Sequence, residues 1–249
     1  MDIPQALLLS PLILVVAFLY SSVGHGGASG YLAVMSLFLT TLAPRQMSTT
    51  ALILNLLVAG LAGLAYWRAG HYRARLLLPF LITSIPTAFL GGQLHVPATT
   101  YGFVLAGALV FAAVRLSLPT PAYAGAIRPI PLGLALLTGA AIGLLSGVVG
   151  VGGGIFLSPL MILFRWADPK QTAATSATFI WINSVSGLLG RLSAGTFATG
   201  PLAIMVAPAF LGGLLGSQLG ARRFSGLIIR RLLALALIIA AGKLILTVI

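Results

Sequence analysis

Long apolar runs separated by short polar, glycine-rich or charged breaks fill most of this 249-residue chain. A helix that crosses a bilayer needs about 20 apolar residues, and runs of about this size recur along the chain. The breaks predict five segments in each half. They lie near 6–24, 28–43, 49–67, 76–94 and 98–115 in the first half, and near 130–149, 154–165, 171–190, 199–220 and 232–248 in the second. The second segment of each half is short for a full span, so the pattern leaves open whether these two segments cross the membrane or re-enter it.

A glycine-rich break appears twice. Residues 23–27 (VGHGG) recur as residues 149–154 (VGVGGG), 126 positions later, and each cluster interrupts an apolar run. A helix broken inside a bilayer exposes N–H and C=O groups that lipid cannot satisfy. Paired breaks at corresponding places in two halves are typical of transporters that bind their substrate near the membrane midplane.

The duplication extends well beyond the glycines. At an offset of 125, the matches are Pro44 with Pro169, Gln46 with Gln171, Thr50 with Thr175, Gly70 with Gly195, Gly91 with Gly216 and Gln93 with Gln218. We therefore expect residues 1–118 to form a first repeat, 119–130 a linker and 131–249 a second repeat, all within one transmembrane domain.

The loop charges indicate how the two repeats are oriented, because cytoplasmic loops carry an excess of Lys and Arg. With five segments per half and the N-terminus outside, the cations expected inside are Arg68, Arg73, Arg75, Arg115, Arg128, Arg165, Lys170, Arg222, Arg223, Arg230 and Arg231, and those expected outside are Arg45, Arg191 and Lys243. Four segments per half would divide the charges about evenly. The predicted fold is thus an all-α polytopic membrane protein of two inverted repeats, with short broken or re-entrant helices at the glycine clusters.

The composition agrees with a membrane protein and narrows the function. The chain is 59% hydrophobic and 6% charged, with a mean hydropathy of +1.11. Its net charge of +12 is interpreted as orientation signals and contacts with anionic lipid headgroups, not as a nucleic-acid surface. The acidic residues are Asp2 and Asp168 alone, and there is no cysteine. We expect no metal site, no cofactor and no enzyme activity, since no catalytic set or phosphate-binding loop is present.

The glycine clusters are the candidate binding site. Each short segment begins just after its cluster, so the cluster forms a helix N-terminus, where unpaired N–H groups and a partial positive charge attract anions. With inverted topology, the two N-termini would meet near the bilayer centre. The residues predicted to offer N–H groups are Gly26, Gly27, Gly152, Gly153 and Gly154. The alternative is close helix packing through small residues, and the pairing of the clusters favours the anion site.

Polar side chains near the clusters complete the predicted site. Ser22, Ser29 and the repeat mates Thr50 and Thr175 would add hydroxyl donors. His25, whose counterpart is Val151, either carries a proton for coupling or binds a carbonyl group at the helix break.

Other polar and aromatic residues are expected at segment ends. Gln93 and Gln218 are predicted to be packing or gate residues. We expect Trp67, Trp166 and Tyr72 to lie in the aromatic belt, and Asp168 to pair with a neighbouring cation.

The two clusters, together with residues 169–176 (PKQTAATS), resemble the TauE/SafE sulfite exporter family over nearly the whole chain. The resemblance implies a bacterial inner-membrane permease for small sulfur-containing anions, such as sulfite or an organosulfonate. The physical argument points independently to an anion, whereas the sulfur rests on the resemblance alone.

Three rival functions remain open at this point. A channel would need a continuous polar pore, a membrane scaffold would bind a partner without transport, and a cation permease would need acidic or clustered histidine ligands. The sequence leaves the substrate, the direction of transport, the coupling ion and a possible homo-oligomeric state undetermined.

Overall fold

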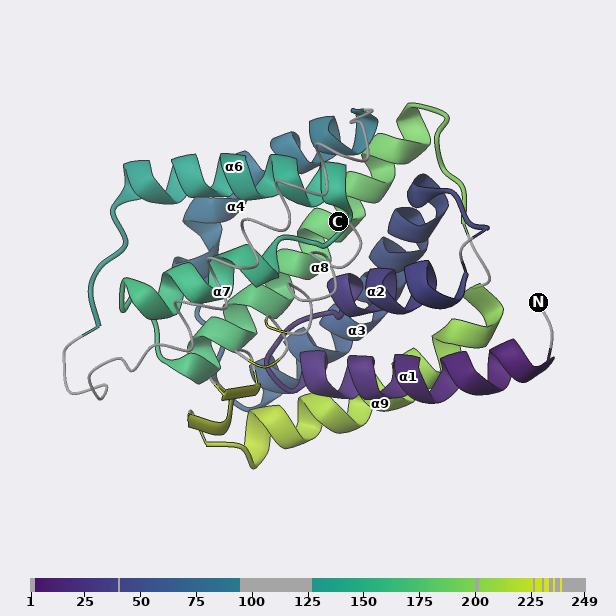
Figure 1. Ribbon diagram of the computed structural model, residues 1–249. Helices are drawn as coiled ribbons and strands as arrows, with labels where there is room; N and C mark the ends of the chain where they lie inside the picture. Colours follow the sequence, from purple (N-terminus) through teal and green to yellow (C-terminus); the bar gives the residue numbers. More distant parts are fainter. Residues whose placement is uncertain are drawn as a thin grey trace.

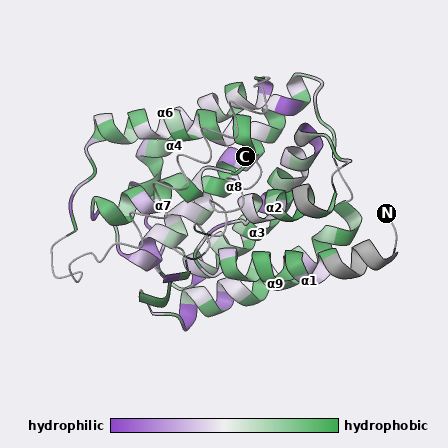
Figure 2. Cartoon of the chain, in the orientation of Figure 1, coloured by the Kyte–Doolittle hydropathy of each residue, from purple (hydrophilic) through white to green (hydrophobic). Residues whose placement is uncertain are grey.

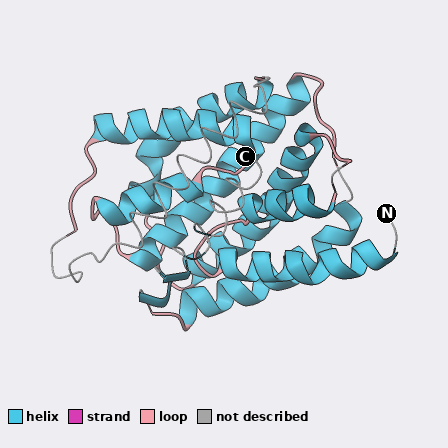
Figure 3. Cartoon of the chain, in the orientation of Figure 1, coloured by secondary structure: helices cyan, strands magenta, loops and turns pink. Residues whose placement is uncertain are grey.

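The computed structural model describes residues 3–39, 41–94, 127–199 and 202–225, together with 227–229, 231, 232, 235 and 238. This part of the chain is helical and contains no strand (Figure 3), as predicted. The helices are α1 (Ile3–Ser21), α2 (Ala28–Phe38), α3 (Pro44–Arg68), α4 (Ala74–Gln93), α6 (Leu132–Val149), α7 (Gly154–Leu163), α8 (Pro169–Ser193) and α9 (Leu202–Arg222). The predicted segment 98–115 and most of the predicted segment 232–248 and linker 119–130 lie outside the described residues.

The helix boundaries follow the predicted segments closely, with differences that have local causes. α2 and α7 begin at Ala28 and Gly154, as predicted. α1 ends at Ser21, three residues early, because the Ser21 carbonyl accepts a bond from the N–H of Gly24 in a turn. α3 and α8 start earlier than predicted because proline, which is favoured at the first helical position, begins both helices.

Helix length separates two short helices from the others. α2 has 11 residues and α7 has 10, which makes them about 16 Å and 15 Å long at 1.5 Å per residue. The hydrocarbon core is about 30 Å thick, so neither short helix can cross it alone. By length and composition, α3, α4, α6 and α9 can each cross a membrane. The chain is therefore a multi-pass membrane protein with two half-length helices.

The helices form pairs that join the two halves of the sequence. α1 packs along α9, and α4 packs along α6 (Figure 1). α3 and α8 contact each other between these pairs, with the short α2 against α3 and the short α7 against α8. Hydrophobic residues cover most of the helices, while hydrophilic positions gather mainly at helix ends and loops (Figure 2). The fourth helix of each half thus packs against the first helix of the other half.

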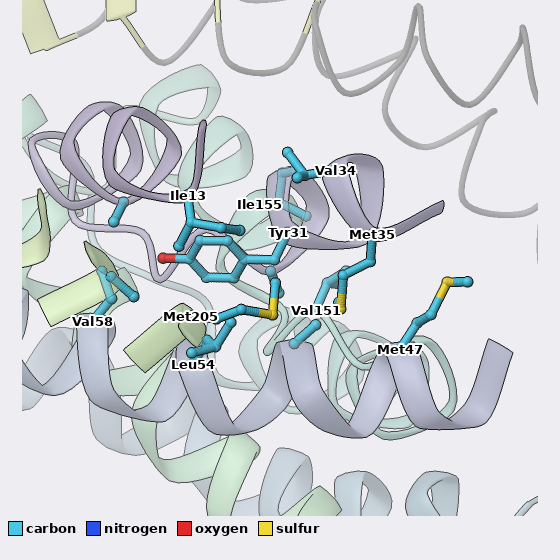
Figure 4. Packing of buried hydrophobic residues seen from close by; sticks show 14 of the residues in the cluster. Ile13, Tyr31, Val34, Met35, Met47, Leu54, Val58, Val151, Ile155 and Met205 are labelled. Atoms are coloured by element: carbon cyan, nitrogen blue, oxygen red, sulfur yellow. The ribbon is translucent and has the colours of Figure 1, made fainter. Parts of the chain in front are cut away.

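The short helices lie in the two main hydrophobic cores: α2 lies in the first, and α7 contributes to both, since Ile155 and Ile162 belong to the first core. Tyr31 of α2 is fully buried, with Ile13 of α1, Leu54 of α3 and Met205 of α9 around it (Figure 4). Helix α7 is packed in the same way against α4, α6 and α8 in a second core. α2 and α7 thus have related surroundings, and α7 also joins the two cores.

Three predictions for residues near helix ends are wrong. Arg191, expected in an outside loop, is 1% exposed within the last turns of α8. Trp166, expected in the aromatic belt, is buried against the rings of Phe80 and Phe164. Asp168, expected to pair with a cation, is the N-cap of α8 and accepts bonds from two backbone N–H groups at 2.8 and 2.9 Å. Arg191 and Trp166 are buried by tertiary packing, and Asp168 caps a helix. Neither role can be deduced from position in the sequence alone.

Candidate functional site

Backbone turns with positive φ form both glycine clusters. Gly24 and Gly27 have φ of 77° and 91°, and Gly150, Gly152 and Gly153 have φ of 82°, 73° and 81°. L-residues with a Cβ disfavour this left-handed region, which glycine adopts readily. The clusters are therefore specific turns, and glycine is needed at several of their positions.

Each cluster provides the start of a short helix. Gly27 is the N-cap of α2 and Gly153 is the N-cap of α7, and no side chain caps either helix at that residue. The first N–H groups of a helix have no partner within the helix. In the first cluster, the N–H of Ala28 donates to Oδ1 of Asn55 at 3.3 Å.

The two clusters meet inside the molecule. Asn55, on α3, accepts from Ala28 at the first cluster and donates through Nδ2 to the carbonyl of Val151 in the second, at 3.3 Å. A methyl group on Gly154 would lie 3.3 Å from Cδ2 of His25. α2 and α7 begin near each other at the centre and run outward in different directions (Figure 1). The structure thus brings together two helix N-termini that are 126 residues apart in sequence.

His25 links the first cluster to the second half through hydroxyl groups. Its ring is 2% exposed, and Nε2 lies 3.2 Å from Oγ of Ser158 on α7. Ser158 is in turn 2.6 Å from Oγ of Ser176 on α8. The ring of Tyr20 stands edge-on to the imidazole, with centroids 6.4 Å apart. His25 is therefore part of a buried polar chain that crosses between the halves.

The predicted hydroxyl residues are all buried, and most of them already donate a hydrogen bond. Ser22 donates to the carbonyl of Leu19 at 2.7 Å, and Thr50 donates to that of Gln46 at 2.8 Å. Ser29 donates to the phenolic oxygen of Tyr20 at 3.0 Å. The hydroxyl of Thr175 has no hydrogen-bond partner among the described residues. The hydroxyls of Ser22, Ser29 and Thr50 would have to rotate away from these acceptors in order to donate to a ligand.

The two predicted gate or packing residues, Gln93 and Gln218, differ in their surroundings. Gln93 ends α4 and donates to Oγ of Ser193 at the end of α8, at 3.0 Å. Gln218 is half-buried on α9. The bond of Gln93 ties two helix ends together, which fits a packing role.

A hollow between α3 and α8 lies apart from the clusters. Its volume is about 430 Å³, and it is lined by residues that include Gly60, Gly63, Trp67 and Trp181. Trp67 is 60% exposed and Trp181 is 44% exposed. This apolar hollow opens on the outer surface of the helix bundle. No group of three potential metal ligands occurs in the described part of the chain.

Comparison with known proteins agrees with the helical membrane architecture. The family model for the sulfite exporter TauE/SafE matches residues 9–244. The chain belongs to the TauE/SafE family.

Two curated relatives carry transporter names. The probable membrane transporter protein y4hK of Sinorhizobium fredii is 34% identical over 244 residues, which cover 96% of this chain and 98% of that protein. The probable membrane transporter protein YunE of Bacillus subtilis is 32% identical over 78 residues, covering 31% of this chain and 29% of that protein. No solved structure gives a significant match. The TauE/SafE chain is thus a member of a membrane transporter family.

Two polar residues of this TauE/SafE chain hold more central places than the sequence suggested. Asn55 joins the clusters, although the sequence analysis did not single it out. The guanidinium of Arg191 contacts the second cluster, since a methyl group on Gly150 would lie 3.2 Å from its Nη2. A single polar or charged residue within an apolar run, as in Leu54-Asn55-Leu56 and Gly190-Arg191-Leu192, is the signal that marks both.

Proposed function

We propose that this protein is a secondary transporter that exports a small sulfur-containing anion, such as sulfite or an organosulfonate, across the bacterial inner membrane. The anion binds at a central site between the two repeats, and alternating access exposes that site to each side in turn. The N-terminus lies outside the cell. The sulfur in this proposal derives from the name of the family, and the anion derives from the site.

The meeting of the two glycine clusters is the observation that carries the proposal. Two helix N-termini, neither capped by the side chain of its N-cap residue, start at one buried place in a bundle of membrane helices, where Asn55 connects them. The positive ends of the two helix dipoles add there, and glycine lets a ligand approach the backbone closely. We assign the anion to the N–H groups of Gly26, Gly27, Gly152, Gly153 and Gly154, with Ser22, Ser29, Thr50 and Thr175 as hydroxyl donors and His25 at the edge of the site.

An inverted relation between the repeats supports alternating access. α1 to α4 have 19, 11, 25 and 20 residues and α6 to α9 have 18, 10, 25 and 21, so each series has a half-length helix in second place. In Figure 1, α1 runs from the N-terminus towards one side of the molecule, and α6 runs in the opposite direction. Inverted repeats around a midplane site are the usual basis for exposing that site to the two membrane faces alternately.

A substrate panel in reconstituted vesicles tests the proposal. Efflux of sulfite, sulfate, thiosulfate, sulfoacetate and taurine is compared in proteoliposomes and in protein-free vesicles. We expect saturable flux of sulfite or of one organosulfonate, accelerated by the same anion on the opposite side. Flux that does not saturate and shows no such acceleration would identify a channel, and absence of flux for every anion would contradict transport.

A pair of variants separates transport from a scaffold role. Gly27→Leu and Gly153→Leu place a large side chain where each short helix begins. If the protein transports an anion at the clusters, both variants lose flux while they remain in the membrane. Normal flux in both variants would show that the clusters do not bind the substrate.

Proton coupling through His25 is part of the same proposal, and its support is the buried chain from His25 to Ser158 and Ser176. The His25→Ala variant is compared with wild type for substrate-driven proton movement, reported by a pH-sensitive dye inside the vesicles. We expect proton movement to stop while exchange of the anion continues. Unchanged counterflow in His25→Ala, together with no proton movement in wild type, would remove the coupling role.

A further inference from the structure

The hollow between α3 and α8 is large enough to hold a ligand, and it lies apart from the glycine clusters. Its volume of about 430 Å³ falls within the range of about 300–1,000 Å³ that is typical of sites for small molecules. It follows α3 from Gly60 to Trp67, which is about 10 Å at 1.5 Å per residue. Half of the hydrocarbon core is about 15 Å thick. The hollow therefore extends over most of one leaflet of the bilayer.

Gly60 and Gly63 keep the hollow open, and close helix packing does not require them. A methyl group on Gly60 would lie 3.1 Å from the side chain of Trp181, and one on Gly63 would lie 3.5 Å from Oγ1 of Thr178. By contrast, a methyl group on Gly190 would overlap the backbone of a neighbouring helix. A larger side chain at Gly63 would therefore extend into the hollow without forcing α3 and α8 apart.

The lining of the hollow suits hydrocarbon better than a polar substrate. Leu64, Trp67 and Trp181 are 40%, 60% and 44% exposed there. The hydroxyl of Thr178, which also lines the hollow, already donates to the carbonyl of Ala174 within α8 at 3.1 Å. Because α3 is long and apolar enough to cross a membrane and the hollow opens on the outer surface of the bundle, the hydrocarbon available to it is the acyl chain of a lipid.

Two exposed arginines stand at one end of the hollow. Arg68 follows Trp67 in the chain and Arg73 follows Tyr72, and both of these aromatic residues line the hollow. Nη1 of Arg73 donates to the carbonyls of Gly70 and Tyr72, at 3.1 Å each. The guanidinium of Arg73 is thus held beside the end of the hollow, with its other N–H groups available to a ligand on the surface.

Positive charge dominates this end of the molecule. The start of α8 and the end of α9 lie against the loop after α3, since Nζ of Lys170 donates to the carbonyl of Ala221 at 3.4 Å and Nε2 of His71 lies 3.1 Å from the same oxygen. Arg222 directly follows Ala221 and is exposed. Asp168, the one acidic residue in the described part of the chain, is engaged as the N-cap of α8. An anionic headgroup would therefore be attracted to this end.

We propose that the hollow binds an anionic phospholipid, with one acyl chain against Gly63 between Trp67 and Trp181 and with its phosphate on Arg68 and Arg73. Basic residues next to a membrane segment attract anionic lipids, and tryptophan and tyrosine favour the level of the headgroups. The hollow and the two arginines thus match the two parts of such a lipid. This inference does not rest on the proposed transport function.

Lipids with brominated acyl chains test the inference, because bromine quenches the fluorescence of an indole that it contacts. Two of the three tryptophans, Trp67 and Trp181, line the hollow, whereas Trp166 is buried. The protein is reconstituted in phosphatidylcholine vesicles that contain the same fraction of brominated phosphatidylglycerol or of brominated phosphatidylcholine. We expect the anionic lipid to quench wild type more strongly than the zwitterionic lipid at every fraction.

A variant that fills the hollow should abolish this difference between the lipids. Gly63→Leu places an isobutyl group where the acyl chain would lie. Gly133→Leu is the matched control, because Gly133 is an exposed residue of α6 where an added methyl group would meet nothing within 4 Å. We expect the control to retain the wild-type preference for the anionic lipid. Thermal unfolding in detergent establishes that each variant is folded.

A second pair of variants tests the charges. Arg68→Gln combined with Arg73→Gln removes the two cations beside the hollow. Each should contribute about a fivefold preference for the anionic lipid, which corresponds to about 1 kcal/mol per basic residue near the surface. Arg222→Gln combined with Arg223→Gln removes the same charge from the end of α9 and should leave most of the preference in place.

Several outcomes would overturn the inference, and none of them depends on transport. Equal quenching of wild type by the two lipids would show ordinary contact with the bilayer. A preference that survives in folded Gly63→Leu would place the lipid elsewhere, and equal losses in the two arginine pairs would show a general surface attraction. If Gly63→Leu does not fold, the arginine pairs decide alone. If neither lipid quenches wild type, the inference is wrong, and a disulfide between two Trp67→Cys chains would identify a second copy as the occupant.

Discussion

At the scale of single residues, Asn55 is the clearest link between sequence and site. Its side chain accepts from Ala28 at the start of α2 and donates to Val151 and to Ser184. An amide can make these bonds at once because it carries both an acceptor and two donors. One buried side chain thus fixes the distance between the two glycine clusters.

Replacement of Asn55 should loosen the site. Asn55→Leu leaves the Ala28 N–H and the Val151 carbonyl without this partner, and each unsatisfied buried group costs about 1–3 kcal/mol. We expect a lower unfolding temperature in detergent and a loss of anion flux. Asn183→Leu is the matched control, because Asn183 is equally buried but donates to Phe179 within its own helix. Equal effects of the two substitutions would argue against a special role for Asn55.

Gly24 allows the strain of a positive φ to be separated from crowding. Gly24 and Gly70 have φ of 77° and 80°, but a methyl group on Gly24 would overlap the backbone of Ala173, whereas one on Gly70 would meet nothing within 4 Å. Gly70→Ala should therefore cost only the left-handed conformation, about 1–2 kcal/mol. Gly24→Ala should cost clearly more and reduce the amount of folded protein, as measured by thermal unfolding. Similar losses for both would mean that the contact with Ala173 relaxes easily.

At the scale of elements, glycine ladders hold the paired helices together. On α6, methyl groups at Gly139, Gly143 and Gly147 would overlap the carbonyls of α4, and on α9 the same holds for Gly212 and Gly216 against α1 and for Gly220 against Ser22, just after α1. Each ladder has a spacing of four residues, which places its members on one helix face. Small residues let membrane helices approach closely and pack by van der Waals contact. Many glycines outside the clusters thus have a packing role.

Substitution within one ladder tests this role. Gly143→Ala would place a methyl group against the backbone of Ser84, so α4 and α6 would have to separate. On the same helix, Gly133→Ala meets nothing within 4 Å and should be neutral or slightly stabilising, since alanine favours a helix by about 1 kcal/mol over glycine. Thermal unfolding in detergent compares the two variants. A stable Gly143→Ala would show that the close approach of α4 and α6 is dispensable.

Much of the element structure could be predicted from the sequence, because caps and breaks are local signals. The starts of α2 and α7 followed from the clusters, and the all-α membrane architecture followed from the apolar runs. The pairing of α1 with α9 and of α4 with α6 could not be predicted, since it depends on contacts between distant segments. The burial of Arg191 could not be predicted for the same reason. A charged residue near the end of an apolar run is expected in a loop unless the helices that surround it are known.

At the scale of the whole molecule, the packing groups differ from the sequence halves. α1, α2, α3 and α9 surround one core, to which Ile155 and Ile162 of α7 and Val149 of α6 also contribute, and α4, α6, α7 and α8 surround the other. A rigid movement of one sequence half against the other would break the α1–α9 and α4–α6 pairs. We therefore expect transport to move these packing groups relative to each other, with α3 and α8 at the boundary.

Paired cysteines can test which bodies move, because the chain has no cysteine of its own. Arg45 and Thr196 belong to different packing groups and are 2.5 Å apart at Nη2 and Oγ1. Joining Arg45→Cys and Thr196→Cys with a short reducible thiol linker should stop flux, and reduction should restore it. Gln93→Cys with Ser193→Cys joins two helices of one group and should leave flux intact. Inhibition by both links alike would contradict movement between the groups.

The fourth helix of each half packs against the first helix of the other half. This pairing also determines the order in which the helix pairs can form during synthesis. Domains generally fold from the N-terminus as the chain emerges, and α4 finds its partner as soon as α6 follows it. Helix α1 is synthesised first, but the helix that packs against it, α9, is the last of the long helices described. Until α9 enters the membrane, the carbonyls of Leu14 and Phe18 in α1, and of Ser22 just after it, lack the glycine face that packs against them. The packing group that contains the first helix to be translated is therefore the packing group that is completed last.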